Sequence, residues 1–246
     1  LAKRSWLKLR RNLMIPVYLK GPDGPSPPEG THYIIARNGN FLRKREWWVD
    51  ATVPVRQISV LDRQKPLAEL LLPTLPAEVL AKASRLAKVV YDISQSEVCL
   101  LLHYNVEAGY QLSVPKQTVS PGRIDYDASE RLSGALCVGT LHSHGALEAY
   151  HSDIDLEDET YADGVHITLG EVHKYPAFSL SAEVVVNGTR FSIDRTWFAG
   201  LVPRGTGYRV DCLAIESWEV PAKWLEVIRH PGWRRPLLEQ EKKLDD

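Results

Sequence analysis

The feature that most constrains this chain is an amphipathic segment followed by short apolar runs. Residues 75–93 carry a single apolar stripe at the spacing i, i+4, i+7, i+11, formed by Val79, Ala83, Leu86 and Val90. That spacing favours a helix that buries one face, and we expect Thr74 to cap it. The apolar runs at 97–104 and 135–141 have the length of buried strands. A helix followed by such strands predicts an α/β domain with a mixed central sheet flanked by helices.

The N-terminal part of the chain is β-rich and has no comparable helical pattern. Runs at 32–36 and 41–49 are joined by residues 37–40 (Arg-Asn-Gly-Asn), and Asn-Gly between such runs is a strong hairpin signal. The pair Trp47-Trp48 lies in the second run, where we expect a ring to pack in a core. These patterns divide the chain into a small β-rich module at 1–72, a core domain at 73–200 and an extension at 201–246.

Composition and charge narrow the classes of function. With 246 residues, 44% hydrophobic and 25% charged, the chain can bury a substantial core. Its formal net charge is −1 and its basic cluster is confined to residues 1–11, so nucleic acid is not the expected partner. No apolar run approaches the roughly 20 residues of a membrane span, and we expect a cytoplasmic protein. Cys99, Cys137 and Cys212 form no disulfide or zinc pattern and indicate free thiols.

The residues with the most specific chemistry follow the run at 135–141. His142 and His144 are two apart at the end of an apolar strand, so both imidazoles project from one face and can share a metal ion. If Ser152 begins a helix, Asp155 lies about one turn later and faces the imidazole pair. Two imidazoles and a carboxylate suit zinc, and a catalytic zinc leaves its fourth position to water.

Each element of this set also has a simpler interpretation. Histidines at a strand end are often plain surface or core residues. Ser152-x-x-Asp155 is a common N-cap pattern, and the acidic residues after Ser152 suit the start of a helix. The metal-site interpretation is favoured because all four residues occur together in a strand–loop–helix setting.

The same residues carry a resemblance to a known family. His142-x-His144, seven residues, Ser152, two residues and Asp155 resembles the signature of the JAMM metalloproteases, which are the catalytic MPN domains. The resemblance implies a zinc ion held by His142, His144 and Asp155, with Ser152 stabilising the oxyanion. It also implies a glutamate from an upstream strand as general acid and base, and Glu97 matches that position.

Glu97 opens the run at 97–104 directly after the amphipathic segment, where the family has its glutamate in a Glu-x-Cys-Gly-Leu-Leu context. Three positions depart from the family pattern: Leu100 stands where Gly is usual, Gly145 where Pro often follows the second His, and His151 where Pro often precedes the Ser. The family spacing gives no ligand role to His151 or Asp153. The resemblance covers about residues 73–195.

The resemblance also implies a substrate. Family members cleave peptide or isopeptide bonds after the C-terminus of ubiquitin or a ubiquitin-like protein. The segments GTLHSHGALEAYHSDIDLEDE and DGVHITLG are similar to those of the plasmid-cassette family called PRTRC system protein A. Those cassettes also encode a ubiquitin-like protein and a ThiF-type activating enzyme, which are therefore the expected partners.

Two further expectations follow. The module at 1–72 is a candidate for partner recognition, and the irregular stretch at 113–129 is the candidate substrate-facing loop.

Two other functions stay open. One is a non-catalytic MPN scaffold, although the usual mark of such scaffolds is loss of the His, Asp or Glu residues. The other is a DNA-associated plasmid protein, against which the neutral net charge argues.

Overall fold

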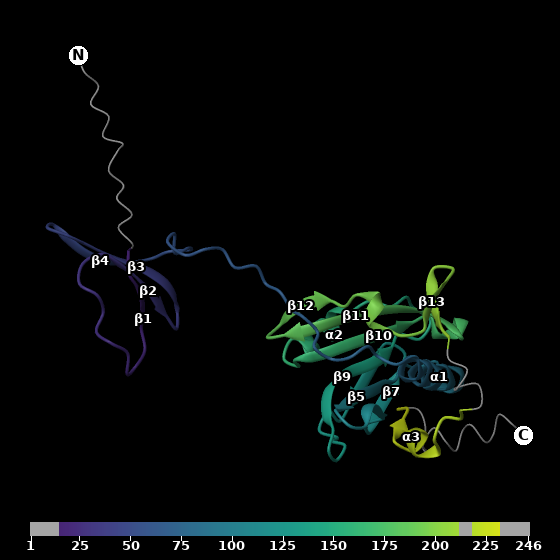
Figure 1. The fold of residues 1–246 in the computed structure, drawn as a ribbon. Coiled ribbons are helices and arrows are strands. Elements are labelled where there is room, and N and C mark those ends of the chain that lie inside the picture. The colour runs from purple at the N-terminus through teal and green to yellow at the C-terminus, as the bar shows by residue number, and fades with distance from the viewer. Residues whose placement is uncertain (1–14, 212–217, 232–246) are drawn as a thin grey trace, which may run out of the picture. The chain divides into compact units, whose positions relative to one another are not determined.

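The computed structural model describes residues 15–211 and 218–231 (Figure 1). The chain divides into two compact units, residues 1–66 and 67–246. The sequence patterns had placed the first boundary after residue 72 and had set residues 201–246 apart as an extension. Cys212 lies outside the described residues, and Cys99 and Cys137 are free thiols. Among the described helices, none is long and apolar enough to cross a membrane.

The first unit contains a four-stranded sheet in the order β1-β2-β3-β4. Its strands are β1 (Val17–Leu19), β2 (His32–Ala36), β3 (Gly39–Glu46) and β4 (Val49–Pro54). The predicted hairpin is confirmed, because β2 and β3 pair antiparallel, with Arg37 and Asn38 in the turn and Gly39 as the first residue of β3. The single strand predicted at 41–49 is wrong, since a turn at Trp47-Trp48 separates β3 from β4. Residues at a hairpin tip leave both faces of the sheet, and Trp47 is 96% exposed instead of packed in a core.

The second unit is built on an eight-stranded sheet in the order β13-β14-β11-β10-β9-β5-β6, with β12 paired to β11. The strands are β5 (Cys99–Asn105), β6 (Gly109–Ser113), β9 (Leu136–Ser143), β10 (Gly164–Gly170), β11 (Ala177–Val186), β12 (Thr189–Ser192), β13 (Leu201–Arg204) and β14 (Gly207–Val210). β9 and β10 are parallel, and the other neighbours are antiparallel. The predicted mixed α/β architecture is confirmed.

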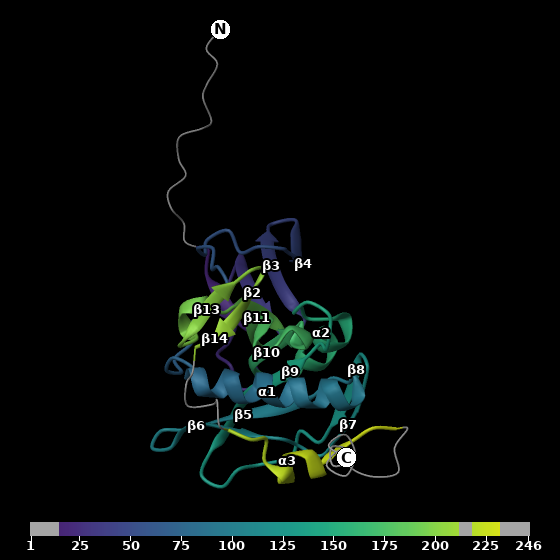
Figure 2. The same ribbon diagram turned by 90° about the vertical axis from the view of Figure 1, so that its right-hand side faces the viewer.

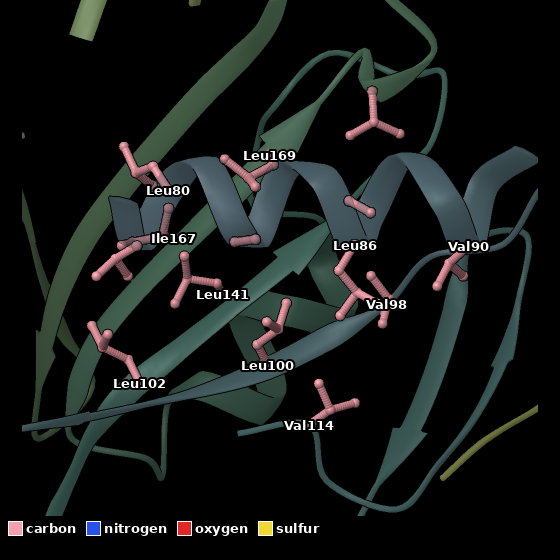
Figure 3. Packing of buried hydrophobic residues seen from close by; sticks show 14 of the residues in the cluster. Leu80, Leu86, Val90, Val98, Leu100, Leu102, Val114, Leu141, Ile167 and Leu169 are labelled. Carbon is pink, nitrogen blue, oxygen red and sulfur yellow. The ribbon is translucent and has the colours of Figure 1, made fainter. Parts of the chain in front are cut away.

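One face of this sheet is apolar and lies under helix α1 (Ala77–Ser94), as Figures 2 and 3 show. The four residues of the predicted stripe are all buried. They pack in one cluster with strand residues that include Leu141 and Ile167, which are 0% exposed. Burying a leucine or isoleucine side chain contributes about 1.5–3 kcal/mol, so this cluster anchors the sheet. The predicted cap is wrong: the N-cap residue is Pro76, not Thr74, and no side chain caps the helix.

The opposite face of the same strands is polar, because side chains alternate along a strand. Thr140 and His142 of β9 point to this face, and their neighbours on β10 are His166 and Thr168. His166 and Thr168 are buried even though they are polar. Their hydroxyl and ring atoms pair across the strands, with Thr140 Oγ1 3.0 Å from His166 Nδ1 and Thr168 Oγ1 3.3 Å from His142 Nε2. Helix α2 (Asp153–Glu159) contacts this polar layer.

The stretch predicted as irregular at 113–129 contains a hairpin. Its strands β7 (Gln117–Ser120) and β8 (Arg123–Tyr126) form a three-stranded sheet with β15 (Ile228–Arg229), in the order β15-β7-β8. A short helix, α3 (Ala222–Glu226), precedes β15. Two short 3-10 helices, η1 (Val172–Lys174) and η2 (Arg195–Trp197), complete the described elements.

Candidate metal centre

The end of β9 is fixed on both sides by hydrogen bonds to its neighbours. Ser143 donates its N–H to the Val98 carbonyl at 3.0 Å, and its Oγ accepts the Val98 N–H at 3.1 Å. His144 donates its N–H to the Leu169 carbonyl at 2.9 Å. The strand therefore keeps its direction through the His-Ser-His segment. His142 and His144 consequently project to the same polar face, as their spacing predicted.

A tight turn follows His144 and returns the chain across β10. Gly145 has φ +55°, a conformation that proline cannot adopt because its ring fixes φ near −65°. The departure from the family pattern at this position thus has a structural cause. Gly170 lies under the returning loop, and a side chain there would collide with the backbone of Glu148 and Ala149. This close approach brings Ser152 to the metal-binding face.

Ser152 is the N-cap residue of α2 and forms a complete capping box with Asp155. The Asp155 N–H donates to Ser152 Oγ at 3.3 Å, and the Ser152 N–H donates to Asp155 Oδ2 at 2.8 Å. The simpler interpretation of the Ser-x-x-Asp pattern is therefore correct. It does not compete with a metal role, because the cap holds the Asp155 carboxylate at the histidine pair.

Three donor atoms converge between β9 and α2. His142 Nε2 and His144 Nε2 are 3.2 Å apart. Asp155 Oδ2 lies 3.3 Å from His144 Nε2, and Asp155 Oδ1 lies 3.5 Å from His142 Nε2. All three side chains are at least three-quarters buried, with exposed fractions of 9%, 5% and 21% in sequence order. The group could hold a metal ion, and it is the one group of this kind among the described residues.

The carboxylate of this group is ionised. Burial alone would raise the pKa of Asp155, but hydrogen bonds from His142, His144 and Ser152 hold that pKa well below its usual range. His144 Nδ1 is buried and has no hydrogen-bond partner among the described residues. When Nε2 faces the metal position, Nδ1 is the nitrogen that carries the ring proton of the neutral imidazole.

Glu97 lies just before β5 and lines a cleft of about 400 Å³ together with the four residues of the motif. Burial raises the pKa of Glu97 to about 7, and the charge of Asp155 adds to the increase while His144 opposes it. Two other glutamates near Glu97 in the sequence, Glu78 and Glu107, do not line the cleft. Glu78 pairs with Lys82 on α1, and Glu107 lies in the turn between β5 and β6.

The cleft has a second wall formed by β8, from Gly122 to Tyr126. This wall belongs to the stretch that was expected to face the substrate. Cys99 also lines the cleft, where burial raises the pKa of its thiol, but it is not part of the close donor group formed by His142, His144 and Asp155. Tyr150 stands at the rim, 47% exposed, with its ring edge-on to that of His144 at a centroid distance of 4.8 Å.

A buried ionic group beside the candidate metal ligands has no counterpart among the sequence predictions. Glu159 of α2 contacts Arg190 of β12 at 2.6 Å and His151 at 3.3 Å. Arg190 also contacts Glu183 of β11 at 3.1 Å. Glu159 stands four residues after Asp155, which places it on the same side of the helix. Arg190 has no sequence signal, because only the folded β11–β12 hairpin brings it to α2.

The comparisons with known proteins add no relative. No model of a protein family matches the chain, and no curated protein matches it.

Proposed function

We propose that this protein is a zinc-dependent peptidase or isopeptidase of the JAMM type, with its second unit as an MPN domain. The observation that carries the proposal is the set of distances among the three donors, 3.2, 3.3 and 3.5 Å. In a tetrahedral site with bonds of about 2.0–2.1 Å, neighbouring ligand atoms lie about 3.3–3.4 Å apart. The two imidazole nitrogens already have the separation of zinc ligands, and a different carboxylate oxygen of Asp155 lies close to each of them. One ligand atom from each of the three residues lies within 4.8 Å of the others, close enough to share one ion.

The donor chemistry supports zinc over the other common divalent cations. Calcium and magnesium prefer oxygen ligands, whereas two imidazoles and one carboxylate suit zinc. Three protein ligands leave one coordination position for a reactant, which is the pattern of catalytic and not of structural zinc. When bound, the ion would supply Lewis-acid chemistry to a scissile carbonyl and to water.

Glu97 is the residue proposed to move protons. It lines the same cleft as the three ligands, and its pKa of about 7 lets it gain and lose a proton near neutral pH. In amide hydrolysis it would take a proton from the attacking water and return it to the nitrogen of the leaving amine. Without Glu97 the attacking water and the amine would lack a buried proton acceptor and donor.

Ser152 is the residue proposed to stabilise the oxyanion. Its hydroxyl donates to Asp155 Oδ2 at 2.7 Å in the structure, so it must turn to reach a substrate oxygen. The Asp155 N–H holds Ser152 Oγ at 3.3 Å, and this contact limits how far the hydroxyl can move. A hydroxyl held in this way needs only a rotation of its hydrogen to donate to a developing negative charge.

The proposed substrate is a ubiquitin-like protein, as a precursor or a conjugate, in a bacterial system that also contains a ThiF-type activating enzyme. The motif resemblance supports this substrate class. The cleft supports an extended peptide as ligand, because it runs between α2 and the edge strand β8. A protein with these partners would act in the bacterial cytoplasm.

The experiment that tests the proposal is cleavage of a reporter fused to the C-terminus of a ubiquitin-like protein. Cleavage is expected after the last residue of the ubiquitin-like protein, to be abolished by a zinc chelator and restored by added zinc. As a control, Glu78→Gln changes a glutamate that lies outside the cleft and should cleave the reporter like the native chain. Equal cleavage with and without chelator would contradict a metal-dependent mechanism, and no cleavage of any such fusion would favour a scaffold.

A further inference from the structure

Helix α2 carries Asp155, and its own sequence gives it little stability. It has seven residues, DIDLEDE, and an isolated helix of that length does not persist in water. Its last turn contains no basic residue, while Glu159 places a negative charge at the negative end of the helix dipole. The capping box secures the N-terminal end, and at the C-terminal end Thr160 donates its N–H to the Glu157 carbonyl and its hydroxyl to the Leu156 carbonyl. A helix this short still depends on support from the rest of the fold.

Arg190 of β12 supplies that support through both arms of its guanidinium. Nη2 donates to the carbonyl of Leu156 at 3.2 Å, and Nη1 donates to Glu159 Oε2 at 2.6 Å. The same Nη1 donates to Glu183 Oε2 at 3.1 Å on β11. Arg190 thus shares the Leu156 carbonyl with the Thr160 hydroxyl, which donates to it at 2.5 Å, and ties the helix to the sheet.

The pair with Glu159 is strong because both side chains are shielded from water, with exposed fractions of 8% for Glu159 and 19% for Arg190. Burial alone would raise the pKa of Glu159, but the contact with His151 and the hydrogen bond from Arg190 lower it, so the carboxylate is ionised. A buried carboxylate without its cation is strongly destabilising. Arg190 already provides the positive charge here, which leaves no role for a second metal ion at Glu159.

We propose that Arg190 is a positioning residue of the metal centre. By fixing the C-terminal end of α2 on the sheet, it sets the place of Asp155 against His142 and His144. The step from Arg190 to Asp155 is short, because Asp155 and Glu159 are one helical turn apart. The link to zinc rests on the proposed function, whereas the link to the position of α2 does not.

The test combines two measurements on the full chain with Arg190→Met. Zinc affinity, measured by competition with a chelator, is expected to fall about 10–100-fold, which is the usual effect of removing a group that holds a ligand in place. Hydrogen exchange of the α2 amides in metal-free protein should become faster, while exchange in α1 stays unchanged. Arg190→Lys keeps the charge but not the forked geometry. Its zinc affinity and its α2 exchange should lie between those of the native chain and those of Arg190→Met.

Two further variants complete the design. Arg85→Met is the matched control: Arg85 is a half-buried arginine of α1 that contacts the Tyr175 ring at 5.8 Å, and its loss should change neither measurement. If Arg190→Met does not fold, the double variant with Glu159→Gln removes the unpaired buried charge and should fold with a loosened α2.

The outcomes separate the two claims. Wild-type zinc affinity or wild-type α2 exchange in a folded Arg190→Met or double variant would overturn the role of Arg190. A native chain that binds no zinc, but whose α2 exchange responds to Arg190→Met, would contradict the proposed function. That second result would still uphold Arg190 as the residue that positions α2.

Discussion

The two faces of the central sheet are held by different kinds of interaction. The face under α1 is a continuous apolar layer in which Leu141 and Ile167 are fully buried. The face under α2 is a buried polar layer, where His142, His166 and Thr168 depend on specific partners. Apolar contacts are non-directional, so the first face tolerates small shifts. Polar groups away from water are costly unless paired, so the second face must keep its geometry.

This comparison explains how one sheet can serve stability and chemistry at once. The apolar face fixes β9 and β10, and the alternation of their side chains then presents Thr140, His142, His166 and Thr168 on the other side. A change on the first face should therefore lower stability without a specific effect on metal binding. A change on the second face should alter metal binding or turnover at a smaller cost in stability.

The largest expected effect comes from Glu97, the residue proposed to move protons. Glu97→Gln should lower the rate of cleavage by about 10²–10⁴-fold, the usual contribution of a general acid–base group. The bound zinc should be retained, because Glu97 is not among the three ligands. Single-turnover kinetics and zinc analysis of the same preparation check both statements. A variant that cleaves at the native rate would remove Glu97 from the mechanism.

The apolar face can be tested with Leu141→Ala. The exposed fraction of Leu141 is 0%, and truncation of such a leucine costs about 2–5 kcal/mol of unfolding free energy. Because the loss lies on the α1 side, the cost should be the same with and without zinc. Denaturant unfolding in both conditions measures it. A cost that appears only with zinc would mean that the two faces are coupled more strongly than their packing indicates.

The polar face predicts a pH dependence of stability in the metal-free protein. The pKa of Glu97 is raised from 4.5 to about 7 by burial, so between these values the folded chain keeps a proton that the unfolded chain has released. Stability should therefore fall as pH rises through this window. Glu97→Gln should remove the fall, which makes the metal-free variant about 1–3 kcal/mol more stable than the native chain at pH 8 but not at pH 4. Unfolding curves at both pH values check the sign, and a fall of equal size in the variant would contradict the assignment.

The smallest expected effect concerns the helix cap. Ser152→Ala removes the side chain that accepts the Asp155 N–H, and loss of an N-cap typically costs about 1 kcal/mol. Ser152→Asn keeps a capping acceptor and should recover most of this stability but not the hydroxyl needed for catalysis. Thermal unfolding together with cleavage assays separates the two roles. If both variants cleave normally, Ser152 serves only as a cap.

The parts of the fold that the sequence could predict are those set by local rules. The stripe of α1 follows from the helical period, and the β11–β12 turn follows from Asn187-Gly188, both of which have positive φ. The convergence of His142 and His144 follows from the alternation of a strand. In each case the physical cause acts over a few residues, so the pattern carries the information.

The parts that could not be predicted depend on the complete fold. Arg190 meets α2 only after β11 and β12 have paired, and nothing in its local sequence signals the contact. The β7–β8 hairpin is short and mostly polar, so it lacks the apolar alternation that marks a strand. Trp47-Trp48 carried a hydrophobic signal, but the turn that exposes the pair is set by the pairing of β3 with β4.

The measurement that tests the central claim most directly is the zinc content of the purified native chain beside that of His144→Ala. The account predicts about one zinc ion per native chain and none in the variant, with the metal-free stability of the two differing little. Asp155→Asn should likewise lose zinc while keeping the Ser152 cap. A native chain without zinc after loading, or a His144→Ala chain that binds zinc as tightly as the native one, would contradict the metal centre.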